Sequence, residues 1–124
     1  MTSIMSTLSP IELNAIAARL DAAATQFSDH SCNDYPLAAN AANKAIAVAT
    51  LKYIEGTGDY EQDWEEFAAD IDDAEDEIEL FDNWLMAYLA QRCKQAASGN
   101  GGAALSAAER EIVAGLLDLA AGEK

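Results

Sequence analysis

The sequence contains no lysine, arginine or histidine between Tyr53 and Gln91, although 14 acidic residues lie in this stretch. Outside it, 8 acidic residues face 7 basic ones, so nearly all of the net charge of −15 comes from roughly a third of the chain. A strongly negative surface disfavours direct contact with nucleic acid or an anionic membrane. We therefore expect a basic protein surface, and not a nucleic acid or a membrane, as the partner.

The chain also lacks the features of exported and membrane proteins. No apolar run reaches the roughly 18 residues of a membrane-spanning helix. The segment Met1–Pro10 has neither the basic nor the apolar region of a signal peptide. Only two cysteines are present, Cys32 and Cys93, which favours free thiols in a reducing compartment. These absences predict a cytoplasmic protein.

Motifs of the common catalytic and cofactor sites are absent too. There is no glycine-rich phosphate-binding loop, no Gly-x-Ser-x-Gly and no Cys-x-x-Cys, and a single histidine excludes the paired Glu-x-x-His motifs of a di-iron bundle. The run that begins at Asp59 starts like a calcium loop, but Trp64 occupies the position that requires glycine. We predict a protein that is not an enzyme and has no cofactor, metal site or catalytic residues. A carboxylate-based metal or hydrolytic site, including the loop His30–Asp34, stays open as an alternative.

Proline is scarce while alanine is abundant, with 2 prolines and 27 alanines among 124 residues, and this composition favours helix. The length suits one domain with one core. We predict an all-α, single-domain bundle over residues 1–124, with a loose tail at 1–7 and a Gly-rich linker at 98–104. Its four main helices are expected at about 10–27, 37–55, 73–97 and 106–121, with a short helix near 60–69.

Local signals place the ends of these helices. Ser9 with Glu12, and Ser106 with Glu109, have the spacing of capping boxes. The helix at 37–55 is apolar over most of its circumference, which predicts that it is the central helix. For the helix at 73–97, Asp72 is the expected N-cap, and apolar residues recur at spacings of three and four: Ala74, Ile78, Phe81, Leu85 and Tyr88.

The acidic run has a charge density comparable to that of DNA. There are 13 acids in the 24 residues from Asp59 to Asp82. On a continuous helix this run would carry roughly one charge per 3 Å, within about a factor of two of duplex DNA. Neighbouring like charges on a helix oppose its formation by roughly 0.2–0.5 kcal/mol per pair. Either a partner uses the acidic face, or the face serves only solvation.

In size, helical alanine-rich character and acid content, the chain resembles the small acidic phage proteins that act as DNA mimics, including anti-CRISPR inhibitors. The resemblance is carried mainly by residues 55–82. It implies a partner with a DNA groove lined by lysine and arginine, blocked by steric occlusion. Tyr60 and Trp64 are expected to be contact anchors, and Phe67, Phe81 and Trp84 to be core residues. The predicted partner-binding residues are Asp59, Tyr60, Glu61, Asp63, Trp64, Glu65, Glu66, Asp70, Asp72, Asp73, Glu75, Asp76, Glu77 and Glu79. The alternative is a structural or regulatory helical subunit.

Overall fold

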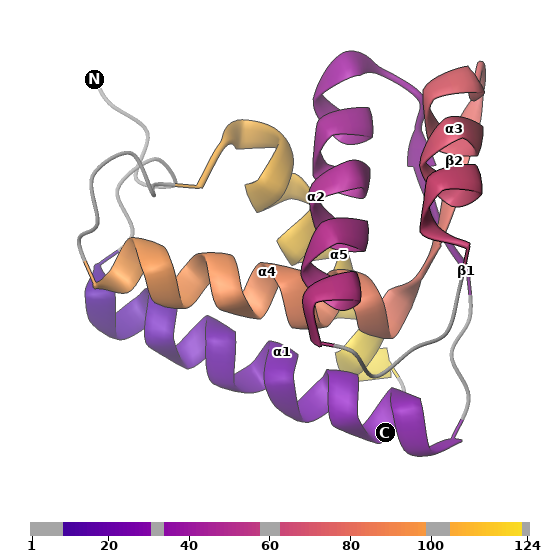
Figure 1. The fold of residues 1–124 in the computed structure, drawn as a ribbon. Coiled ribbons are helices and arrows are strands. Elements are labelled where there is room, and N and C mark those ends of the chain that lie inside the picture. Colours follow the sequence, from indigo (N-terminus) through magenta and orange to yellow (C-terminus); the bar gives the residue numbers. More distant parts are fainter. Residues whose placement is uncertain (1–8, 31–33, 58–62, 99–104, 123–124) are drawn as a thin grey trace.

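The computed structural model describes residues 9–30, 34–57, 63–98 and 105–122 (Figure 1). The predicted tail at 1–7 and residues 99–104 of the predicted linker lie outside these ranges. Helices dominate the described residues, which confirms the all-α class, and one small antiparallel sheet accompanies them. In chain order the elements are α1 (Pro10–His30), β1 (Asp34–Ala38), α2 (Ala41–Thr57), α3 (Trp64–Asp73), β2 (Glu77–Phe81), α4 (Asp82–Ala97) and α5 (Ala107–Gly122).

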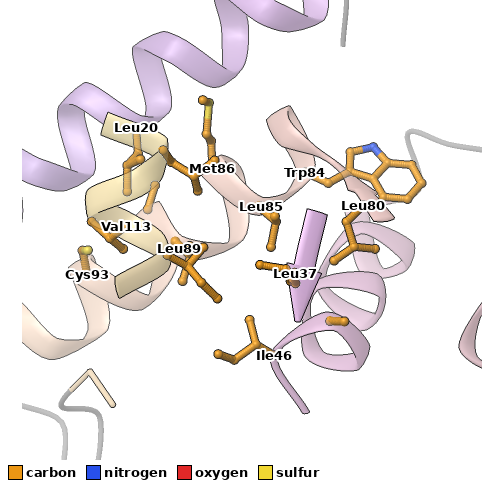
Figure 2. Close-up of a cluster of buried hydrophobic side chains, with 14 of the residues drawn as sticks. Leu20, Leu37, Ile46, Leu80, Trp84, Leu85, Met86, Leu89, Cys93 and Val113 are labelled. Atoms are coloured by element: carbon orange, nitrogen blue, oxygen red, sulfur yellow. The ribbon is translucent and has the colours of Figure 1, made fainter. Parts of the chain in front are cut away.

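Helix α4 forms the centre of the structure. It lies alongside α1 over most of its length (Figure 1), and α2, α5 and β2 also pack against it. No charged residue occurs between Asn83 and Gln91, so this part of α4 can be surrounded on several sides. Figure 2 shows its side chains Leu85, Met86 and Leu89 among residues from the other elements.

The prediction that the second helix is central is therefore wrong. Helix α2 buries Ile46, Ala47, Thr50, Leu51 and Ile54, but its other faces contain exposed alanines. Alanine counts as apolar in a sequence pattern, yet its small side chain costs little when it is exposed to water. The large apolar side chains that decide burial are concentrated in α4.

Both predicted capping boxes are confirmed. The Ser9 N–H donates to Glu12 Oε1 at 3.1 Å, and the Glu12 N–H donates to Ser9 Oγ at 3.2 Å. At the start of α5, the Ser106 N–H donates to Glu109 Oε1 at 2.8 Å and the Glu109 N–H donates to Ser106 Oγ at 3.1 Å. These reciprocal bonds satisfy N–H groups that have no partner within the helix.

Two predicted helix starts are wrong, because both segments form strands. Residues 34–38 were expected to be a loop followed by helix, and residues 77–81 to be helix. In β2 the side chains of Ile78 and Leu80 are buried while those of Glu77 and Glu79 are exposed, which is the alternation of a strand. Helix α2 begins only at Ala41, after Asn40, whose Oδ1 accepts the N–H of Asn43 at 2.9 Å.

Helix α3 also differs from the prediction. Asp63 is its N-cap and accepts the N–H of Glu66, and the helix continues through Asp73 without the expected break. Ile71 is buried and extends the apolar face that begins at Trp64, which explains the continuation. Asp72, the predicted N-cap of the next helix, instead lies in the last turn of α3.

Candidate functional site: an acidic surface on α3 and β2

Ten of the predicted acidic residues are exposed on two consecutive elements and their connection. We call this set the acidic surface. Helix α3 and strand β2 both lie to the right in Figure 1, beyond α2. The predicted site residues Asp59, Tyr60 and Glu61 lie outside the described residues. The acidic surface consists of Asp63, Glu65, Glu66, Asp70, Asp72, Asp73, Glu75, Asp76, Glu77 and Glu79.

Aromatic packing attaches α3 to the start of α4. The ring of Trp84 lies 5.5 Å from that of Trp64, 5.9 Å from that of Phe67 and 4.9 Å from that of Phe81, the last edge-on. Tilted and edge-on pairs at these separations are favourable by about 0.5–1.5 kcal/mol beyond their buried area. Trp84 is buried and the other three rings are partly buried. The aromatic cluster thus holds the helix that presents the acids.

Trp64 takes part in this packing and is also partly exposed at the surface. It was expected to be a contact anchor, and the structure places its ring against Trp84 with part of the side chain still open to solvent. Phe67, expected in the core, is packed against the core while remaining partly exposed. A partner that contacts α3 would therefore meet the edge of an aromatic cluster between the carboxylates.

The acids of α3 lie at both ends of the helix dipole. Asp63, Glu65 and Glu66 are at the N-terminus, where negative charge is favourable. Asp70, Asp72 and Asp73 are at the C-terminus, where negative charge is unfavourable by about 0.3–1 kcal/mol each. Asp72 was expected to be the N-cap of a helix that begins at Asp73, so the sign of their dipole interaction is the opposite of the expected one.

A contact from α2 offsets part of this charge. Lys44 Nζ donates to the main-chain oxygen of Asp72 at 2.8 Å. The ammonium thus satisfies a carbonyl at the C-terminal end of α3 and does not form an ion pair with a carboxylate. This arrangement stabilises the helix end and leaves the acidic side chains available.

Strand β2 continues the acidic surface beyond α3. Glu77 pairs with Ala38 and Glu79 with Pro36 across the two-stranded sheet, so the exposed face of the sheet holds two carboxylates and no cation opposite them. The charge spacing calculated for one continuous helix does not apply, because the acids are distributed over a helix, a turn and a strand.

Two basic residues elsewhere in the structure form ion pairs with other carboxylates. Arg92 Nε lies 2.8 Å from Glu109 Oε2, and Lys94 Nζ lies 2.7 Å from Asp21 Oδ2. Within the described ranges, no ion pair involves any of the ten carboxylates of the acidic surface. The acidic surface is therefore concentrated on α3, β2 and their connection, and the described basic residues do not neutralise it.

Asp82 belongs to the acidic run in the sequence but not to the acidic surface. Its side chain is at the start of α4 and only 1% of its surface is exposed. Its Oδ1 accepts the N–H of Asn83 at 2.7 Å, in the first turn of the helix, where the dipole favours an anion. In the sequence, the apolar neighbours Phe81, Trp84 and Leu85 indicate that the side chain of Asp82 enters the core.

The open alternatives of a metal or hydrolytic site receive no further support. Among the residues that the structure describes, no three His, Cys, Asp or Glu side chains gather closely enough to hold a metal ion. The side chains of the loop His30–Asp34 lie outside the described part. Cys93 is buried, and this burial, with the charge of Glu109, raises the pKa of its thiol to about 11 against the opposing effect of Arg92. Such a thiol is a poor nucleophile near neutral pH.

None of the helices in the described ranges combines the length and the apolar character that a membrane span requires. In comparisons with known proteins, no protein-family model, curated protein or solved structure matches the chain. The class of the chain therefore rests on its own geometry: a small helical bundle with a one-sided acidic surface.

Proposed function

We propose that the acidic surface binds a basic, nucleic-acid-binding site on a partner protein and blocks it. The observation that carries this proposal is the group of ten exposed carboxylates on α3 and β2, none of them ion-paired within the described residues. A phage-encoded anti-CRISPR inhibitor of a DNA-surveillance complex is the kind of protein that this function describes. The chain itself would be neither an enzyme nor a nucleic-acid-binding protein, and would act in the cytoplasm.

The energetics support a role in binding over a role in folding. Three acids occupy the C-terminal end of α3, where they oppose the helix dipole. Glu66 and Asp70, four residues apart on the same helix, add a like-charge pair. Lysine at Asp70, Asp72 or Asp73 would favour the helix, so stability alone does not account for these acids. A partner groove rich in arginine and lysine would gain from them through steering and complementary contacts.

The second candidate is a structural or regulatory subunit whose acidic face serves only solvation. It is favoured by the same exposure, because solvated carboxylates keep a small protein soluble without any partner. The two candidates differ in what charge reversal does. In the second, partner binding survives reversal of the acids; in the first, it is lost.

The experiment is a capture from cell lysate on immobilised protein, washed with increasing salt, with the retained proteins identified. The wild type is compared with the reversal variant Asp72→Lys/Asp73→Lys/Asp76→Lys/Glu77→Lys. We expect the wild type to retain a nucleic-acid-binding protein at low salt, to release it as salt screens the surface, and the variant to retain none. A captured protein should also release labelled duplex DNA when the wild type is added.

A matched control separates the position of the charges from their total. Asp73→Lys/Glu77→Lys changes the acidic surface, whereas Asn14→Lys/Ala15→Lys/Ala18→Lys/Ala22→Lys makes the same change in net charge at exposed positions of α1. The proposal requires the first variant to weaken capture much more than the second. Equal weakening by both variants would assign the capture to net charge and would reject a defined acidic interface.

A further inference from the structure

A groove of about 670 Å³, away from the acidic surface, runs between β1, the first turn of α2 and the first turns of α5. Four consecutive strand residues, Tyr35–Ala38, line it. Side chains of consecutive strand residues point to opposite faces of a sheet, so a groove over one face would be lined by alternate residues. Lining by all four indicates that the groove follows the edge of β1.

This edge of β1 has no neighbouring strand among the described residues, because the sheet consists of β1 and β2 alone. The pairing shows which backbone groups face away from β2. Ala39 N donates to Asp76 O at 3.1 Å, which continues the register in which Tyr35 pairs with Leu80 and Leu37 with Ile78. In an antiparallel ladder, hydrogen-bonded and non-bonded pairs alternate, so Pro36 and Ala38 direct their backbone groups into the groove.

Only two backbone groups remain for a ligand at this edge. Pro36 has no N–H. The Ala38 oxygen already accepts from Asn40 N and from Asn43 Nδ2, both at 2.9 Å. What is left is the Pro36 carbonyl oxygen and the Ala38 N–H, and neither has a hydrogen-bond partner among the described residues.

These two groups suit a parallel strand better than an antiparallel one. In antiparallel pairing, each outward residue of β1 exchanges two hydrogen bonds with one partner residue, through its N–H and its C=O, so Pro36 and Ala38 would each form only one of the two. Pro36 cannot donate, and both lone pairs of the Ala38 oxygen are used. In parallel pairing, a single partner residue donates to the carbonyl of one residue and accepts from the N–H two residues later, which matches Pro36 and Ala38.

The charge around the groove indicates the character of the ligand. Glu111 lines the groove and is exposed, and none of the described residues that line the groove is basic. Burial, and then the charges of Asp118 and Glu111 on α5, raise the pKa of Tyr35, so the surroundings of its hydroxyl are negative. Small side chains at Ala41, Ala107 and Ala108 leave space for an added backbone.

We propose that this groove binds an extended, basic segment of a partner polypeptide as a third strand, parallel to β1. The Pro36 carbonyl accepts from one residue of that segment, and the Ala38 N–H donates to the carbonyl of the same residue. Recognition by strand addition uses main-chain hydrogen bonds for affinity and neighbouring side chains for specificity. Here Glu111, which lines the groove, selects lysine or arginine.

The test uses the hexapeptide acetyl-Thr-Lys-Val-Lys-Thr-Lys-amide, added to the full chain and followed by amide NMR. We expect the peptide to shift the amide signals of Tyr35, Leu37 and Ala38 and to slow hydrogen exchange at the Ala38 amide. A second peptide of the same sequence, with every backbone nitrogen methylated, keeps the charge but cannot donate. It should bind about tenfold more weakly or worse.

Two substitutions on β1 complete the test. Ala38→Pro removes the donor but no internal hydrogen bond, and Leu37 already has the extended conformation preferred before proline, so we expect the fold to be retained, which thermal unfolding of the variant checks. Its affinity for the peptide should fall about tenfold. Pro36→Val adds an outward N–H and should strengthen binding.

Three results would overturn the proposal. The first is equal binding of the methylated peptide or of Ala38→Pro. The second is a set of peptide-induced shifts confined to the acidic surface, which would show attraction by charge alone. The third is a dimer of the free chain that Ala38→Pro dissociates, since the groove would then hold a second copy.

Discussion

Arg92 and Glu109 join α4 to α5 through two hydrogen bonds, from Nε to Oε2 at 2.8 Å and from Nη2 to Oε1 at 3.1 Å. Only 5% of Glu109 is exposed, and its Oε1 also accepts the N–H of Ser106 in the capping box. One carboxylate therefore closes the start of α5 and docks that helix on the central helix. A fork-shaped pair of this kind is more directional than a single lysine contact.

Replacing Glu109 with alanine should destabilise the protein strongly. The change removes the cap and leaves the partly buried guanidinium of Arg92 without this carboxylate. We expect a loss of about 2–4 kcal/mol in the free energy of unfolding, below the upper range for fully buried pairs because Arg92 keeps some contact with solvent. Urea denaturation measures the loss. As a control, Glu111→Ala, two residues along on an exposed position, should change stability by less than about 0.5 kcal/mol.

The contribution of Glu109 should depend on pH. Burial acts to raise the pKa of Glu109, but the hydrogen bonds from Arg92 and Ser106 and the charge of Arg92 outweigh it, so the pKa lies below its ordinary value of 4.5. A lowered pKa in the folded state means that the unfolded chain takes up the proton more readily. The stability from Glu109 is thus fully present above pH 4.5 and is lost as the pH falls through the folded-state pKa.

The measurement is the difference in unfolding free energy between wild type and Glu109→Gln across pH 2 to about 7. This difference should be constant in the upper part of the range and should shrink on acidification below pH 4.5. Taking a difference removes the effect of the other carboxylates, which both proteins share. A difference that grows on acidification would contradict the assigned sign.

Cys93 should resist thiol reagents in the folded protein. Its pKa of about 11, against an ordinary 9.0, implies a thiolate fraction about 100-fold lower at pH 8, and the side chain is also buried. In a Cys32→Ser variant, which leaves one thiol to report, labelling should be slow in buffer and fast in denaturant. Equally rapid labelling in both conditions would show that α4 opens readily around this position.

Gly115 and Tyr35 should show strong coupling. A Cβ added at Gly115 would collide with the Tyr35 hydroxyl, whereas the Tyr35 Cζ atom lies 3.5 Å away, at ordinary contact distance. In the wild type, Gly115→Ala should lower stability by about 0.5–2 kcal/mol, because the overlap outweighs the gain in helix propensity. In a Tyr35→Phe background the same change should raise stability by about 0.5–1 kcal/mol. Thermal unfolding of the four proteins measures this double-mutant cycle.

The two ends of α3 should respond oppositely to the same charge reversal. Asp73→Lys places a cation at the C-terminus and should raise stability by about 0.5–1 kcal/mol at low salt, while Glu65→Lys at the N-terminus should lower it by a similar amount. Both residues are exposed, and both changes should diminish at high salt. If Asp73→Lys stabilises the fold and yet weakens partner capture, loss of folding cannot explain the lost binding.

The sequence predicted the helices that carry strong local end signals. Ser9 with Glu12 and Ser106 with Glu109 placed the starts of α1 and α5 correctly, because a capping box depends on residues three apart. The prediction of secondary structure failed between Asp70 and Phe81. There, a helical spacing and a strand alternation share Ile78, and only tertiary burial of Leu80 and exposure of Glu79 distinguish them.

The candidate site was partly predictable for similar reasons. Exposure of the acids followed from their charge, and all ten described carboxylates of the acidic surface are indeed at the surface. Their position relative to the helix dipole did not follow, because it required the true end of α3 at Asp73. The groove beside β1 was not predicted at all, since it depends on a strand that local patterns did not reveal.

The aromatic cluster around Trp84 separates the charged segment from the rest of the bundle. The side chains that pack residues 63–79 against the rest of the protein are mainly Trp64, Phe67, Ile71 and Ile78. The exposed residues of this segment do not take part in that packing. Mutations at those outward positions could therefore accumulate without rebuilding the interior. If the acidic surface binds a partner as proposed, its charges can change with that partner while the scaffold stays the same.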